Sequence, residues 1–244
     1  GVVGDLNVDK AKILRCTNSG VVNYNATIYG KGTLSDHHVG GVAGSLICDA
    51  DGCVNTGAIN IGTQVQAVEG AVPAITICTG GCFGKTSSGT ISNCTNKGAV
   101  TFLKDAKTYG YSIGGVAGWS ESTIDGCTNE GAISAYGDTV ECDGKLVSTK
   151  IGGLAGYAGV VKNSTNLASG KVTVKGKIYP SGEWPNGTRG TSIGGLFGHK
   201  NSTTTNCHNY APLDVTVNTA QPALYTMVGA FYIGGLAGYV GSGW

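Results

Sequence analysis

Few side chains in this sequence combine the types and the spacing that catalysis or metal binding requires. The run Asp36 to His38 places two imidazoles side by side, but His199 and His208 stand elsewhere. The stretch "CDADGC", Cys48 to Cys53, begins like a calcium loop and lacks the glutamate that would complete it. The acidic residues are scattered, whereas acid–base cleavage of glycosides uses paired carboxylates. We therefore expect no catalytic residue, no metal site and no cofactor.

Aromatic residues are the better candidates for contact with a ligand. Tyr179 and Trp184 lie among turn-forming residues in "KIYPSGEWPNGTRG", and Tyr109 and Tyr111 lie in "YGYS". Exposed Tyr and Trp rings stack on sugars or anchor protein interfaces. The sequence thus predicts ligand contacts at Trp184, Tyr179, Tyr109 and Tyr111, with Trp184 the best candidate. We expect a different role for Trp119, Tyr157 and Tyr239. Each follows the glycine motif at the same position of the repeat, which predicts a structural stack of aromatic rings.

The composition excludes several classes of protein. Charged residues make up 13% of the 244 residues and the net charge is +1, so no basic footprint for nucleic acid exists. No run of 18 apolar residues is present, so we expect no insertion into a membrane. Neither an initiator Met nor a signal peptide is visible, which suggests a mature or excised piece. With 43 glycines and 41% hydrophobic residues, the chain reads as an ordered, turn-rich β protein.

Two short signals alternate along the chain. The first is Ile-Gly-Gly-Leu/Val-Ala-Gly, which begins at Val39, Ile113, Ile151, Ile193 and Ile233, with a degenerate copy at Thr79. The second is Cys-x-Asn-x-Gly, which begins at Cys16, Cys53, Cys94 and Cys127, with degenerate copies at Ser164 and Cys207. The glycine pair is followed by the Cys/Ser position after 12 to 14 residues, whereas the return arc varies from 16 to 26 residues. Solenoids collect insertions as loops on one face in this way.

The residue types indicate short strands and stacked side chains. β-Branched residues precede the cysteines, as in "TISNC" and "TIDGC", and segments such as "GAVTF" begin a third strand. We expect the Asn and Gly of the second motif to form a turn with left-handed backbone conformation. One repeat position should form an interior ladder of thiols and another a ladder of hydrogen-bonded amides. These positions hold Cys16, Cys53, Cys94, Cys127 and Cys207, and Asn18, Asn55, Asn96, Asn129, Asn166 and Asn209.

The fold prediction is an all-β single domain over residues 1–244. It is a β-solenoid, most simply a right-handed parallel β-helix of about six repeats with inserted loops on one face. The alternative is that each insertion folds back as a hairpin beside the coil. Because no polar capping unit is visible, we expect the chain to be a fragment of a longer array. The nine cysteines are an odd number, and the other four, Cys48, Cys78, Cys82 and Cys142, leave the thiol state open.

The two motifs together resemble the GLUG-type repeats of bacterial surface proteins, over nearly the whole chain. The resemblance implies an adhesin-like β-solenoid on the cell surface or secreted, and carries no catalytic residues. We therefore expect a non-enzymatic extracellular module that displays variable loops. Its expected partners are host or microbial glycans or surface proteins and neighbouring repeats of the parent chain. The alternative is a carbohydrate-active parallel β-helix enzyme, a polysaccharide lyase or hydrolase. The copies at Thr79 and Ser164 depart from the family pattern.

Overall fold

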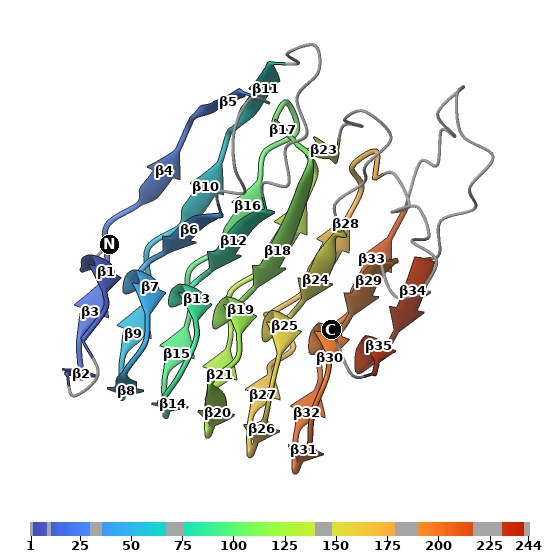
Figure 1. The fold of residues 1–244 in the computed structure, drawn as a ribbon. Coiled ribbons are helices and arrows are strands. Elements are labelled where there is room, and N and C mark those ends of the chain that lie inside the picture. Colours follow the sequence, from blue (N-terminus) through green and yellow to red (C-terminus); the bar gives the residue numbers. More distant parts are fainter. Residues whose placement is uncertain are drawn as a thin grey trace.

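The structure is a computed structural model that describes residues 2–8, 11–29, 36–66, 76–139, 148–178, 190–216 and 231–241. These residues form an all-β parallel β-solenoid of about five turns, without helices (Figure 1). Within these ranges every strand pairing is parallel, so the described parts of the insertions do not fold back as hairpins. No described segment is a helix long and apolar enough to cross a membrane.

Five stacked sheets make up the wall of the solenoid, and the coil passes through them in a fixed order. Sheet 1 contains β1 (Val3–Leu6), β7 (Ala43–Leu46), β13 (Phe83–Thr86), β19 (Ala117–Ser120), β25 (Ala155–Ala158), β30 (Phe197–Lys200) and β35 (Ala237–Val240). Sheet 2 contains β2 (Lys12–Leu14), β8 (Asp49–Asp51), β14 (Thr90–Ser92), β20 (Thr123–Asp125), β26 (Val161–Lys162) and β31 (Thr204–Thr205). Sheet 3 contains β3 (Thr17–Asn18), β9 (Val54–Asn55), β15 (Thr95–Asn96), β21 (Thr128–Asn129), β27 (Thr165–Asn166) and β32 (His208–Asn209).

The return arc of each coil supplies the remaining strands. Sheet 4 contains β4 (Val22–Tyr24), β10 (Ile59–Ile61), β16 (Val100–Phe102), β22 (Ile133–Ala135), β28 (Val172–Val174) and β33 (Leu213–Val215). Sheet 5 contains β6 (His37–Gly40), β12 (Thr76–Gly80), β18 (Gly110–Gly114), β24 (Lys150–Gly152), β29 (Thr191–Gly194) and β34 (Phe231–Gly234). Between sheets 4 and 5, β5 (Thr27–Tyr29) pairs with β11 (Gln64–Gln66), and β17 (Lys107–Thr108) pairs with β23 (Asp138–Thr139).

Each coil therefore has more strands than the three that the sequence suggested. The glycine motif spans two strands, because its first half ends sheet 5 and its second half begins sheet 1. The Asn motif forms a separate two-residue strand in sheet 3. The long insertions enter and leave at one place, between sheet 4 and sheet 5, whereas the other connections differ by only a few residues from coil to coil. Figure 1 shows the coils side by side, with β1 and β35 at opposite ends of the stack.

Two separate hydrophobic cores fill the coil. One lies inside sheets 1 to 3 and contains small residues such as Ala43, Cys53 and Ala117. The other lies between sheets 4 and 5 and contains rows of β-branched residues, for example Ile59, Val100 and Ile133 in register on sheet 4. β-Branched side chains pack well on a pleated surface, so these rows favour the strand conformation that they stabilise.

The left-handed turn lies immediately before the Cys-x-Asn-x-Gly motif, three residues ahead of the motif asparagine. The ladder asparagines are strand residues, whereas a positive φ occurs immediately before each Cys/Ser position, at the corner between sheets 2 and 3. The six residues are Arg15, Gly52, Asn93, Gly126, Asn163 and Asn206. Glycine and asparagine tolerate this conformation, which explains five of the six. The expectation that the Cys-x-Asn-x-Gly motif itself supplies the left-handed residue was wrong.

Candidate functional site

A continuous ladder of buried amides runs along the axis of the solenoid. In each step the Nδ2 of one asparagine donates to the Oδ1 of the next, over 2.8 Å from Asn18 to Asn55 and 2.9 Å from Asn55 to Asn96. The same bond continues over 2.8–3.0 Å through Asn129, Asn166 and Asn209. Each Nδ2 of the interior also donates to a backbone carbonyl of its own coil, as Asn96 does to Gly98 at 2.9 Å.

The second glycine of each pair makes room for this ladder. A Cβ on Gly115 would lie 2.1 Å from Oδ1 of Asn129, and one on Gly81 would lie 2.2 Å from Oδ1 of Asn96. Such distances are far below van der Waals contact, so a side chain at either glycine would push the amide out of line. The glycine motif and the Asn motif of one coil therefore contact each other between the two hydrophobic cores, where the second glycine faces the asparagine amide.

The cysteines of the repeat form a second row, beside the amides. Cys53, Cys94 and Cys127 are fully buried, Ser164 takes the next place, and Cys16 and Cys207 at the two ends are partly exposed. Hydrogen bonding to the thiol of Cys127 is the main cause that raises the pKa of Cys94 to about 12. A thiol that stays protonated is a poor nucleophile and a poor metal ligand, so these buried residues act as small apolar side chains.

The other described cysteines are also free thiols. Cys82 lies in the same core as the row, whereas Cys78, four residues earlier, is on the opposite side of the glycine pair. Burial raises the pKa of Cys78 to about 12. Cys142 lies outside the described residues.

An aromatic column stands in the angle between sheets 1 and 5. Trp119 stacks on Tyr157 with ring centroids 4.0 Å apart, and His199 continues the column at 5.2 Å from Tyr157 and 4.9 Å from Tyr239. Lys150 reaches over from sheet 5, with its Nζ 4.9 Å from the Trp119 ring centroid. Trp119 and Tyr157 stack face to face, whereas the His199 ring is tilted by 32° to Tyr157 and by 50° to Tyr239, and the contacts between neighbouring coils stabilise the stack.

Burial strongly perturbs the ionisable member of the aromatic column. His199 is 6% exposed, and desolvation is the main cause that lowers its pKa to about 4, with a smaller effect of Lys150. The imidazole is therefore neutral at pH 7. A neutral imidazole can pack between Tyr157 and Tyr239 without a buried charge.

The two candidate ligand-binding tyrosines of "YGYS" are interior residues. Tyr109 is 2% exposed and Tyr111 is 0% exposed, and Tyr111 stacks on Phe102 with centroids 4.7 Å apart. The expectation that they present rings to a ligand was wrong, because Tyr111 in β18 (Gly110–Gly114) and Tyr109 just before it are both packed into the sheet 4–sheet 5 core. Tyr179 and Trp184 lie outside the described residues, so their contact with a ligand remains a prediction.

The acidic residues of the polar runs "DHH" and "CDADGC" form hydrogen bonds and ion pairs with neighbouring coils. Asp49 accepts a hydrogen bond from the Thr90 amide at 3.0 Å and pairs with Lys12 at 3.3 Å. Asp51 accepts from Asn93, and Asp36 pairs with Lys85 at 3.4 Å. The described residues contain no group of three His, Cys, Asp or Glu side chains arranged to hold a metal ion.

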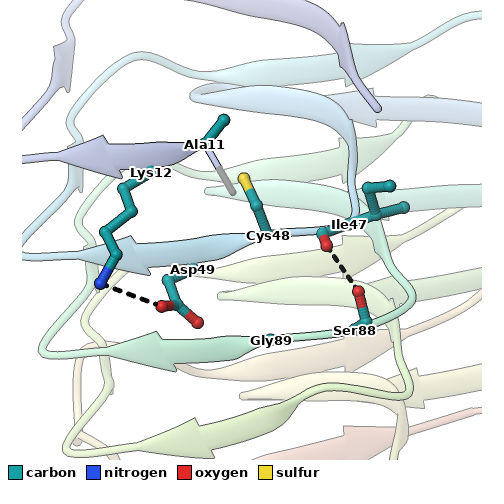
Figure 2. A pocket seen from close by; sticks show the side chains of 7 residues that line it. All are labelled: Ala11, Lys12, Ile47, Cys48, Asp49, Ser88 and Gly89. Carbon is teal, nitrogen blue, oxygen red and sulfur yellow. Dashed lines mark hydrogen bonds and ion pairs between the residues drawn. The ribbon is translucent and has the colours of Figure 1, made fainter. Parts of the chain in front are cut away.

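A hollow on the wall of the solenoid is open and polar. It has a volume of about 340 Å³ and lies over β2 and β8, where Lys12 and Asp49 form its rim (Figure 2). Ser88 closes the opposite side through a hydrogen bond to the carbonyl of Ile47. The Lys12–Asp49 pair is already satisfied and the thiol of Cys48 has a raised pKa, chiefly through burial, so the hollow lacks a free charge or a nucleophile.

Comparisons with known proteins add no relative to this description. No protein-family model matches the chain, no curated protein matches it, and no solved structure matches it.

Proposed function

We propose that this chain is a non-enzymatic structural and adhesive module of a bacterial surface protein, exposed outside the cell or secreted. The observation that carries the proposal is the placement of its variable segments. Successive rungs of the amide ladder are separated by 37, 41, 33, 37 and 43 residues, yet the coils stay in register. Most of the variation falls between sheets 4 and 5, so a stack of paired coils carries segments of unequal length along one edge.

A stack of paired coils that carries variable segments along one edge suits the display of those segments rather than catalysis. Each coil is fixed to its neighbours by strand pairing, and a change in one segment leaves the pairing of the others intact. The similarity of both motifs to GLUG-type repeats supports a cell-surface setting and glycans or surface proteins as partners. For the enzyme alternative, the described residues offer no favourable grouping, since Asp51 and Asp125 are separated by Ser92 in their row and each accepts from an asparagine amide.

A binding screen tests the adhesive role. The isolated chain is applied to a glycan array and to immobilised extracellular matrix proteins, together with Trp184→Ala and Tyr210→Ala. Tyr210 is 63% exposed and stands beside the amide ladder, away from the variable edge, so it controls for general loss of an exposed aromatic ring. We expect Trp184→Ala to lose a bound ligand that Tyr210→Ala retains. Absence of any ligand on either surface would refute adhesion and leave only a spacer role.

A further inference from the structure

One glycine motif, "TGGCFG", departs from the others at two buried positions. Thr79 stands in a row that otherwise holds Val39, Ile113 and further isoleucines, and its Oγ1 is buried without a hydrogen-bond partner among the described residues. Cys82 stands in a row that otherwise holds valine and leucine. The equivalents of Cys82 are Val42, Val116, Leu154, Leu196 and Leu236. Both changes destabilise this coil, because they remove apolar contacts and bury an unpaired hydroxyl.

Cys82 lies across the hydrophobic core from the thiol row. Its side chain is fully buried in the core inside sheets 1 to 3, which also contains Cys53 and Cys94. The backbones that carry Cys82 and Cys94 approach each other close by, because a Cβ on Gly81 would lie 2.1 Å from Cγ of Asn96. Cys94 directly precedes β15 and Asn96 ends it, so these two buried side chains point to the same side. Among the described coils, only this one places a thiol of the glycine motif opposite a thiol of the row.

We propose that Cys82 and Cys94 form a disulfide bond, which ties the glycine motif of this coil to its Asn motif. The inference goes beyond the proposed function, and the pairing does not depend on that function. The bond would close the short loop that runs between the two motifs through sheets 1 and 2, and a closed loop restricts the unfolded chain. It would therefore stabilise the coil that carries the unpaired hydroxyl of Thr79.

The geometry of the stack disfavours the alternative bonds within the thiol row. Successive cysteines of the row belong to parallel strands in register, so their Cβ atoms are separated by about 4.8 Å, the distance between strands. A disulfide requires Cβ atoms about 3.5–4.5 Å apart. A bond across the core is not subject to this spacing, because strand pairing does not fix the distance between opposite walls of a coil.

The electrostatic surroundings of Cys82 agree with Cys94 as its partner. Burial is the main cause that raises the pKa of Cys82, followed by the charge on Cys94 and then by the charge on Cys53. Because a Coulomb interaction weakens with distance, this order fits a thiol that lies nearer to Cys94 than to Cys53.

Formation of the bond requires an oxidant, for which a small disulfide such as glutathione disulfide suffices. One cysteine, as its thiolate, attacks a sulfur of glutathione disulfide, so a mixed disulfide forms and one glutathione leaves. The second thiolate attacks the protein sulfur of the mixed disulfide and releases the second glutathione. Two electrons pass from the cysteines to glutathione disulfide, and the two cysteine protons go to the glutathione thiols. Because Cys82 and Cys94 are buried and their pKa values are raised in the folded chain, we expect the exchange before this coil closes.

Peptide mapping of the refolded protein tests the pairing. The chain is unfolded and reduced, refolded in a buffer of glutathione and glutathione disulfide, blocked with N-ethylmaleimide and digested with trypsin. Trypsin cleaves after Lys85 and after Lys97, which separates Cys94 from every other cysteine. We expect the Cys94 peptide to be linked to the peptide that contains Cys82 in most of the refolded chains.

Three variants identify the partner, each with a residue that the chain already uses at the same position. Cys82→Val introduces the residue that two other coils hold there and should abolish the link. Cys53→Ser and Cys78→Ser should retain it, although both positions lie in the same tryptic peptide as Cys82. Serine occurs in their rows at Ser164 and Ser112. Far-UV circular dichroism verifies that each variant folds.

The melting temperature shows whether the bond stabilises the coil. The wild type refolded with glutathione disulfide should melt about 6 °C or more above the wild type refolded under reducing conditions. Cys82→Val should melt at the same temperature after either treatment. Equal melting temperatures for the two preparations of the wild type, a link that survives Cys82→Val, or a refolded wild type in which Cys94 is alkylated throughout overturns the proposal.

Discussion

Replacement of Asn96 by alanine tests whether the amide ladder stabilises the solenoid. The Asn96 side chain is fully buried and makes three hydrogen bonds, to the Gly98 carbonyl at 2.9 Å, to Asn129 at 2.8 Å and from Asn55 at 2.9 Å. Each bond contributes about 1 kcal/mol net, and a buried polar partner left unsatisfied costs about 1–3 kcal/mol. The variant strands the amide of Asn55 and the carbonyl of Gly98. We therefore expect a loss of about 4 kcal/mol in the free energy of unfolding.

The matched control is Asn18→Ala, at the open end of the same ladder. Asn18 makes two side-chain hydrogen bonds, both of 2.8 Å, and stands at the edge of the stack, where water replaces what is lost. We expect a loss of about 1–2 kcal/mol there. Urea unfolding followed by far-UV circular dichroism gives both values by linear extrapolation. Equal losses in the two variants, or a loss below about 1 kcal/mol in Asn96→Ala, would refute the account of the ladder as a buried network.

Three further predictions concern stability. Gly115→Ala should lower the free energy of unfolding in urea by about 3 kcal/mol or more, because its Cβ would lie 2.1 Å from Asn129. Gly235→Ala is the control and should change that free energy by less than about 0.5 kcal/mol, because its Cβ would meet nothing within 4 Å. Lys200→Leu should raise the melting temperature, since burial lowers the pKa of this lysine to about 8 and opposes its charge at neutral pH. The pKa of His199 is lowered to about 4 in the folded chain, so as the pH falls the unfolded chain binds this proton first. The free energy of unfolding should therefore decline by about 1–2 kcal/mol between about pH 6.5 and pH 4. His199→Tyr should remove that decline, as measured by thermal melting at a series of pH values.

Sequence reasoning placed several side chains on the wrong surface or in the wrong turn. Tyr109 and Tyr111 look like display residues because tyrosine and glycine are common in turns, and only the packing of β18 and of the residue before it against sheet 4 reveals that both rings are buried. The left-handed corner falls on glycine or asparagine in five coils and on Arg15 in the first, but always just before the Cys-x-Asn-x-Gly motif, whose own Asn and Gly look like the better turn residues. The split of the glycine motif into two strands depends on the close approach of sheet 1 to sheet 5, a contact between backbones that leaves little mark on side-chain type.

The sequence by itself determined the repeat, the parallel stacking of like residues, and the place where insertions are accepted. It could do so because each coil repeats the same local requirements: β-branched rows, a small residue at the thiol position, and an asparagine in every rung. Only the tertiary structure decided which glycine faces the asparagine and which of the other cysteines are buried. Those properties depend on how the glycine motif and the Asn motif of one coil approach each other between the two cores, and this approach is not encoded in any single motif.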